Sequence, residues 1–361
     1  MASRGKVEAN TSIFRRLDEY CASRGEPITN QGSKRFIETK KEDRDFLTDA
    51  RKVQTLDLSP SLKISRFDHA DRSFFVTAGY DLLEIPEGMQ EEQLNGGVLT
   101  ASLYEMELRP IVKPIEVREV VEVSDMGDSG YLGHDFHQLA SLFPPIQILS
   151  TEPLVKGESA NIFLLLCLSD RRRFDHWIDD HLAAALGKMA SVSSNAIPYA
   201  VLCRAVLDFD PAALFLALYR SLEALYSREK TTGLMSGIGI SMDWFQMAQQ
   251  LELHLGWYPR EDQSLEALFQ SASETDLSKV LAALNEAPKE GNKPHVTAAR
   301  RVYALRNALV HYRPFHQSFK FDDIEWCRLC EAMSSLVLDL YTAAPTDASG
   351  SARKAPRATR D

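Results

Sequence analysis

The 361-residue sequence lacks the patterns that mark secreted and membrane proteins. Its five cysteines are an odd and scattered set, unlike a disulfide framework. The most apolar run, at residues 162–168, is far shorter than the ~20 residues that a membrane-spanning helix needs. Residues 1–10 are polar and hold no apolar leader. We therefore expect a cytoplasmic protein without a membrane partner.

Recognisable cofactor and metal motifs are also missing. Residues 1–200 hold no phosphate-binding loop and no Rossmann glycine pattern. Cys327 and Cys330 have the spacing of half a zinc site, but no second Cys or His pair follows, so we expect buried helix thiols. His134 and His137 lie three residues apart without a convincing third ligand, which favours surface or loop histidines over a metal site. We expect neither a metal nor a cofactor.

Composition and charge bound the class of protein. With 44% hydrophobic and 25% charged residues, a chain of this length can fold as two globular domains. The formal net charge of −10 argues against a general nucleic-acid coat, because a polyanion is repelled by excess negative charge. Any contact with phosphate must therefore come from a local basic patch.

Residues 1–200 carry mixed helical and strand patterns. A helix capped by Thr11 or Ser12 is expected, and an amphipathic helix is expected at residues 173–189. Runs of β-branched and aromatic residues with partial alternation predict strands, with a turn at residues 95–97. The predicted strands are residues 73–79, 97–108, 115–123, 146–149 and 162–168. We expect an α+β domain over residues 1–200.

The strand pattern ends at Asp210, which is followed by Pro211. This pair is a strong helix start, because a capping carboxylate precedes a proline in the first turn. A glycine-rich loop is expected at residues 233–239. Further helices are expected at residues 242–254, 265–284 with a break at Ser273, 296–312 and 322–341, the last capped by Asp322 and Asp323. We predict an all-α helical bundle over residues 205–342 and a disordered tail at residues 343–361.

One segment of this acidic chain is free of acidic residues. Between Lys293 and Phe321 there is no Asp or Glu, although Asp and Glu outnumber Lys and Arg by 51 to 41 in the whole chain. The basic residues of the segment are Lys293, Arg300, Arg301, Arg306, Arg313 and Lys320. A local positive surface of this kind favours phosphate as a ligand. A chance gap on a solvated helix is the alternative.

The spacing within this segment suggests a chemical site. Asn307 and His311 share a helical face, whereas Arg306 and His311 are ~140° apart around a helix. Arg306 and His311 can serve one site only if the helix ends at His311, which Pro314 favours because residues before proline avoid the α conformation. Arginine supplies a fork for phosphate oxygens and histidine transfers protons. Together they suit attack of an RNA 2′-hydroxyl on the adjacent phosphate without a metal.

Residues 306–312, with the sequence Arg-Asn-Ala-Leu-Val-His-Tyr, resemble a family signature. The family is HEPN (higher eukaryote and prokaryote nucleotide-binding domains), in which an arginine is followed after four to six residues by a histidine. Residues 219–226 resemble the first helix of its ApeA-like branch. The resemblance covers residues 205–342 and says little about residues 1–200.

The resemblance implies an endoribonuclease that needs no metal and works as a homodimer with one composite site. Arg306 would neutralise the scissile phosphate, His311 would act as general acid or base, and Asn307 would orient the site. Glu223 would hold Arg306, with a surface carboxylate as an equal alternative. Tyr312 would stack on a base, although a core aromatic is the favoured interpretation. Further RNA contacts would come from Arg300, Arg301, Arg313 and Lys320, for some of which simple solvation is the alternative.

The same resemblance implies a biological setting. The resemblance to this branch suggests that the chain acts in prokaryotic antiviral or abortive-infection defence, with RNA as its substrate. Residues 1–200 would then sense a phage trigger or restrain the nuclease. One alternative is a HEPN module that binds RNA or nucleotide, or only dimerises, without cleavage. Another is a toxin silenced by a separate antitoxin. The intact set of Arg306, Asn307 and His311 favours the nuclease.

Overall fold

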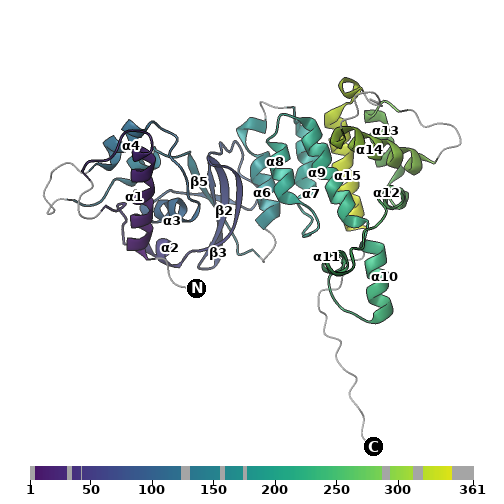
Figure 1. Cartoon of the computed structure of the whole chain (residues 1–361), viewed down its shortest axis with the longest axis horizontal. Helices are drawn as coiled ribbons and strands as arrows, with labels where there is room; N and C mark the ends of the chain where they lie inside the picture. The colour runs from purple at the N-terminus through teal and green to yellow at the C-terminus, as the bar shows by residue number, and fades with distance from the viewer. Residues whose placement is uncertain are drawn as a thin grey trace, which may run out of the picture. The chain divides into compact units, whose positions relative to one another are not determined.

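The protein divides into two compact units, residues 1–176 and residues 177–361 (Figure 1). The second unit begins earlier than the expected boundary at residues 200–205, because helices α7 (Asp180–Met189) and α8 (Tyr199–Val206) pack with the later helices. The computed structural model describes residues 5–30, 35–41, 43–122, 131–154, 159–173, 177–286, 293–311 and 320–343, without the side chain of residue 262. Residues 344–361 of the predicted tail lie outside these ranges.

The first unit is built on a five-stranded antiparallel sheet with the order β1-β2-β3-β5-β4. The predicted strands at residues 73–79 and 146–149 are confirmed as β3 and β5. The first three strands follow one another through short turns, which pair them with their sequence neighbours. The strands are β1 (Arg51–Ser59), β2 (Leu62–His69), β3 (Arg72–Ala78), β4 (Gln90–Glu92) and β5 (Ile146–Thr151).

The two faces of this sheet carry different helices. Successive side chains of a strand point to opposite faces, so Phe74 and Val76 of β3 face one way and Phe75 faces the other. Val76 belongs to a buried core with one group of helices. Phe75 instead contacts Phe163 of α6 (Ser159–Leu168), with ring centroids 5.9 Å apart. The first group comprises α1 (Lys6–Ala22), α2 (Arg44–Asp49), α3 (Gly96–Glu105), α4 (Pro114–Val121) and α5 (Phe136–Ala140).

Three segments predicted as strands are helices, and those predictions were wrong. Residues 97–108, 115–123 and 162–168 correspond to α3, α4 and α6. Asn95, expected in a turn between strands, caps α3 by accepting a hydrogen bond from the Val98 amide at 2.9 Å. Pro114 opens α4 as its first residue. Most residues of α3 and α6 are buried, so these helices have no polar face to give the period of 3.6.

The first helix also begins earlier than expected. Thr11 was predicted as a possible cap, but α1 already starts at Lys6. The Thr11 hydroxyl donates to the carbonyl of Val7 at 2.7 Å, which satisfies it inside the helix. Ile13, Phe14 and Leu17 of this helix are buried.

The second unit is entirely helical in its described residues. Helix α9 is its central element, with Leu214, Phe215, Leu218 and Leu222 fully buried. The Asp210 carboxylate caps α9 by accepting from the Ala212 amide at 2.9 Å, as predicted. Helix α15 packs beside α7, α9 and α13, and α12 packs beside α14. The later helices are α9 (Pro211–Leu225), α10 (Arg228–Ile238), α11 (Trp244–Leu255), α12 (Glu261–Gln270), α13 (Glu274–Ala283), α14 (Pro294–Val310) and α15 (Trp326–Thr342).

Two details of the helical prediction needed correction. Residues 233–239 were expected as a loop but form the second half of α10, which ends at the left-handed Gly239. Asp322 and Asp323 lie in a short 3₁₀ turn, and α15 begins only at Trp326. The break at Ser273 is confirmed, since its hydroxyl caps α13.

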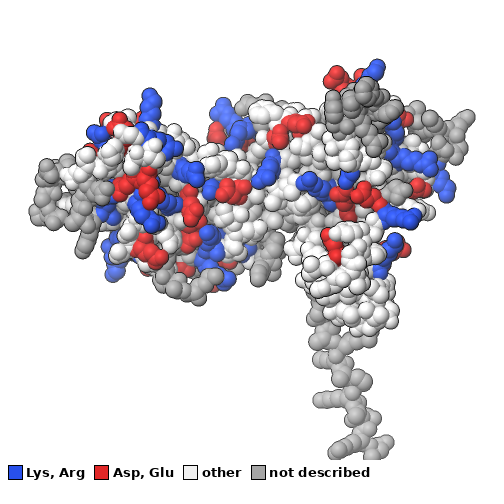
Figure 2. All heavy atoms as spheres, viewed as in Figure 1, with Lys and Arg blue, Asp and Glu red and all other residues white. Residues whose placement is uncertain are grey.

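Helices α10 and α11 form a hairpin that projects from the rest of the second unit (Figure 1). Figure 2 shows few charged side chains on its surface. Leu234, Ile238, Ile240 and Met242 are exposed there. No described helix is both long and apolar enough to span a membrane.

Candidate functional site

The Arg306 side chain lies against helix α9 rather than in solvent. Helix α14 presents Arg306 toward Glu223 of α9, and Nη2 of Arg306 lies 3.4 Å from Oε1 of Glu223. A second carboxylate, Glu261 at the start of α12, lies 3.9 Å from the same nitrogen. The Arg306 side chain is 21% exposed, so part of it remains open to solvent. The predicted pairing of Arg306 with Glu223 is therefore present.

Asn307 contributes a second contact to the guanidinium. Its side-chain oxygen accepts a hydrogen bond from Nη1 of Arg306 at 3.0 Å. Arg306 is thus held from two sides by Asn307 and Glu223, which fixes the plane of its fork. This geometry agrees with an orienting role for Asn307.

The pKa of the Glu223 carboxyl is raised above its usual value. Burial is the main cause, the Glu261 charge adds to it, and the Arg306 guanidinium opposes it. The charged form of Glu223 is therefore held at a cost, although its cationic partner is close.

Two buried tyrosines complete the floor beneath Arg306. The guanidinium carbon lies 5.8 Å from the centre of the Tyr219 ring, a cation–π arrangement. The Tyr226 hydroxyl donates to the Tyr219 hydroxyl at 3.1 Å. Burial raises the pKa of Tyr219 to about 12, so the phenol stays neutral beneath the guanidinium. Neither tyrosine was predicted as a site residue, although Tyr219 lies one helical turn before Glu223.

His311 lies at the point where α14 ends. Its backbone is extended, with φ −108° and ψ 112°, so the prediction that the helix ends there is confirmed. The His311 amide still donates to the carbonyl of Asn307 at 2.9 Å, and the residue is exposed. Among the described residues its imidazole has no hydrogen-bond partner. One chain thus gathers Arg306, Asn307 and Glu223 and leaves His311 at the exposed helix end.

The remaining basic candidates occupy different surroundings. Arg300 on α14 and Lys320 are exposed. Arg301 is ion-paired with Glu286 at 2.6 Å, which occupies part of its guanidinium. Tyr312 and Arg313 lie outside the described residues. Exposure alone therefore leaves Arg300 and Lys320 as the accessible basic residues of this set.

Among the described residues, no group of three or more His, Cys, Asp or Glu side chains could hold a metal ion. His134, expected at the surface or in a loop, is buried in the first unit against the rings of Phe14 and Tyr131. Burial lowers the pKa of His134 to about 4, so it is neutral near pH 7. The buried thiol expected at Cys330 is confirmed, whereas Cys327 is half-buried.

Comparisons of this chain with protein-family models, with curated proteins and with solved structures find no match.

Proposed function

We propose that the second unit is a HEPN-type endoribonuclease that needs no metal. The observation that carries the proposal is the partly exposed Arg306 side chain, whose guanidinium is held by Asn307 and Glu223 on a helix that ends at an exposed histidine. The segment around it has no acidic residue between Lys293 and Phe321, although Glu223, Glu261 and Glu286 from other helices and loops pair with its Arg306 and Arg301. A fixed cation and a free imidazole are the two groups that this reaction requires.

The chemistry assigns one task to each group. The RNA 2′-oxygen attacks the adjacent phosphorus while the bond from phosphorus to the 5′-oxygen breaks. Arg306 would neutralise the charge that builds on the phosphate oxygens, and Asn307 would keep the guanidinium in plane. His311 would take the proton from the 2′-hydroxyl or give one to the leaving 5′-oxygen. The products would be a 2′,3′-cyclic phosphate and a 5′-hydroxyl.

A homodimer would complete the site. Within one chain Arg306 faces α9, while His311 lies at the helix end without a described partner. A second copy that brings its own segment to the same place would supply the missing group. The second unit also exposes Leu234, Ile238 and Ile240 on the hairpin of α10 and α11, a type of apolar surface that protein contacts cover.

We also propose a role in prokaryotic antiviral or abortive-infection defence, with the first unit as a sensor or restraint. This part is supported by the resemblance of residues 306–312 and 219–226 to the ApeA-like branch. The trigger would be a phage component, or the restraint would be a separate antitoxin. In either case the cleaved partner is RNA.

A second candidate is an RNA-binding or dimerising module that does not cleave. The observation that favours it is the pair of carboxylates at Arg306, because Glu223 and Glu261 already neutralise the guanidinium. Phosphate would then have to displace both acids. Binding without cleavage is the distinguishing property of this candidate.

The test is cleavage of RNA by purified protein in EDTA and, separately, with Mg²⁺. We expect Arg306→Ala and His311→Ala each to abolish cleavage in both buffers, with circular dichroism spectra like that of the wild type. The control is His254→Ala, which removes another exposed histidine from the same unit. The protein with this substitution should cleave RNA normally. Undiminished cleavage by His311→Ala would overturn the catalytic assignment, and RNA binding without cyclic phosphate ends would establish the second candidate.

A further inference from the structure

Glu261 and Glu223 are held beside Arg306 in different ways. Glu223 accepts a hydrogen bond from Nη2 of Arg306 at 3.4 Å, and its side chain is 29% exposed. Glu261 lies 3.9 Å from the same nitrogen, which is beyond hydrogen-bond range, and its side chain is 44% exposed. Charge alone therefore holds Glu261 at the guanidinium, and Glu261 is the more accessible of the two acids.

The two acids also repel each other. Burial raises the pKa of the Glu223 carboxyl, the Arg306 guanidinium opposes this rise, and the Glu261 charge adds to it. Release of Glu261 into solvent would relieve that repulsion, whereas release of Glu223 would break the hydrogen bond that positions the guanidinium. Glu261 is therefore the acid that an incoming anion can replace.

The helical turn that carries Glu261 is loosely held. Glu261 is the first residue of α12, and the preceding Arg260 makes no side-chain hydrogen bond that would cap the helix. No described side chain of residues 261–264 is buried. The buried anchors of α12, Leu265 and Phe269, lie further along the helix. An uncapped turn without buried side chains can open without disturbing the core.

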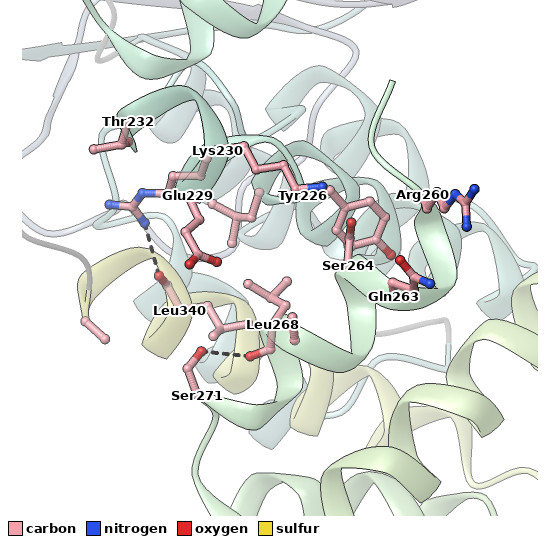
Figure 3. Close-up of a pocket in the computed structure, with 14 residues that line it drawn as sticks. Tyr226, Glu229, Lys230, Thr232, Arg260, Gln263, Ser264, Leu268, Ser271 and Leu340 are labelled. Atoms are coloured by element: carbon pink, nitrogen blue, oxygen red, sulfur yellow. Dashed lines mark hydrogen bonds between the residues drawn. The ribbon is translucent and has the colours of Figure 1, made fainter. Parts of the chain in front are cut away.

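This turn also borders open space. A pocket of about 620 Å³ lies between α12, the end of α9, the start of α10 and the end of α15. Gln263 and Ser264 line it together with Tyr226, and the Arg260 guanidinium is directed away from it (Figure 3). The first turn of α12 can therefore shift toward the pocket when Glu261 leaves Arg306.

We propose that Glu261 is a displaceable counter-ion, which occupies the place of an RNA phosphate beside Arg306 and leaves when RNA binds. One anion then replaces another, so Arg306 keeps two negative neighbours and its hydrogen bond to Glu223. Glu261 would thus keep small anions from Arg306, whereas an RNA strand adds contacts at further phosphates and displaces it. The inference rests on the proposed binding of RNA at Arg306 and adds a contact that regulates it.

RNA binding by the full-length His311→Ala protein, in which the proposed cleavage is absent, measures the effect of Glu261. We expect Glu261→Gln to tighten the binding of a short single-stranded RNA about threefold to tenfold at low salt, because RNA no longer has to displace an acid. The affinity should also fall more steeply with salt, since no released carboxylate takes up a cation. The matched control is Glu266→Gln, which removes another carboxylate of α12 and should change the affinity less than about twofold.

The tightening must depend on Arg306. In a protein with Arg306→Met, Glu261→Gln should change the RNA affinity less than about twofold, because the guanidinium that Glu261 blocks is absent. In the protein with His311 intact, Glu261→Gln should lower KM for RNA, whereas Glu223→Gln should lower kcat because the guanidinium loses its hydrogen bond. A merely structural role of Glu261 would produce neither the dependence on Arg306 nor this split.

Equal or weaker RNA affinity in the Glu261→Gln protein, or the same tightening with and without Arg306, would overturn the proposal. If neither the wild type nor Glu261→Gln binds RNA, the nuclease proposal fails, and phenylglyoxal labelling of arginines with peptide mass spectrometry decides the role of Glu261. Faster labelling of Arg306 in Glu261→Gln, with unchanged labelling of the exposed Arg300, would retain Glu261 as the counter-ion that controls access to Arg306. Equal labelling of Arg306 in both proteins would overturn it.

Discussion

Replacing Arg306 by methionine should show how much its ion pairs with residues of α9 and α12 contribute to the free energy of unfolding. In the wild type, Nη2 of Arg306 lies 3.4 Å from Glu223 and 3.9 Å from Glu261. At an effective dielectric constant of ~20, the nearer pair attracts by about 5 kcal/mol. Desolvation and partial solvent screening, at 21% and 29% exposure, offset much of this attraction. We expect Arg306→Met to lower the free energy of unfolding by about 1.5–3 kcal/mol at pH 7.

The same substitution should make the stability depend on pH in a defined direction. Glu223 already has a raised pKa in the folded protein, and loss of Arg306 removes the guanidinium whose charge and hydrogen bond oppose this rise. A carboxyl with a raised folded pKa contributes stability that is fully present below its unfolded pKa and is lost as the pH rises through the folded value. The cost of Arg306→Met should therefore be larger at pH 7 than at pH 4.

Urea denaturation at pH 7 and pH 4, followed by circular dichroism, measures both effects. The double variant Arg306→Met/Glu223→Gln is the control, because it removes the unpaired charge together with its partner. We expect this double variant to recover part of the stability lost at pH 7. An Arg306→Met protein as stable as the wild type at pH 7, or an equal cost at the two pH values, would refute this electrostatic account.

Three further substitutions test the fold. Leu218→Ala, at a fully buried position of α9, should cost about 2–5 kcal/mol in urea denaturation, and a cost below 1 kcal/mol would contradict the central place of α9. Asp210→Ala should cost about 1 kcal/mol by removing the α9 cap, whereas Asp210→Asn should retain most of the stability. Gly97→Ala should lower the melting temperature of the first unit, because a Cβ would collide with the backbone carbonyl of Asp43; an unchanged melting temperature would show that α3 does not pack so closely.

The parts of the fold that the sequence predicts well are those governed by local chemistry. Asp210 before Pro211 and the break at Ser273 are specified by capping residues, and both are confirmed. The strand prediction for residues 162–168 is wrong because α6 is buried against the sheet and shows no amphipathic period. The strand prediction for residues 115–123 is wrong because their valines favour strands, whereas Pro114, just before them, starts a helix. Tertiary burial, which the sequence does not display, decides the first case, whereas in the second the sequence carries two opposing local signals.

In the candidate site, too, local features could be predicted from the sequence, whereas contacts between helices could not. Pro314 was the residue that favoured a helix end near His311, and α14 does end at Val310, because a helix boundary is a local property. The pairing of Arg306 with Glu223 was anticipated only as one of two equal alternatives. Glu261 was missed, since its place beside Arg306 depends on how α12 packs against α9 and α14. No local spacing encodes that contact.

The most direct test of the central claim is to map the ends of RNA incubated in EDTA with purified wild-type protein or with His311→Ala. The proposed mechanism predicts new 2′,3′-cyclic phosphate and 5′-hydroxyl ends with the wild type and none with His311→Ala. The same ends in equal amounts from both proteins, or no new ends from wild-type protein that is dimeric and bound to RNA, would contradict it.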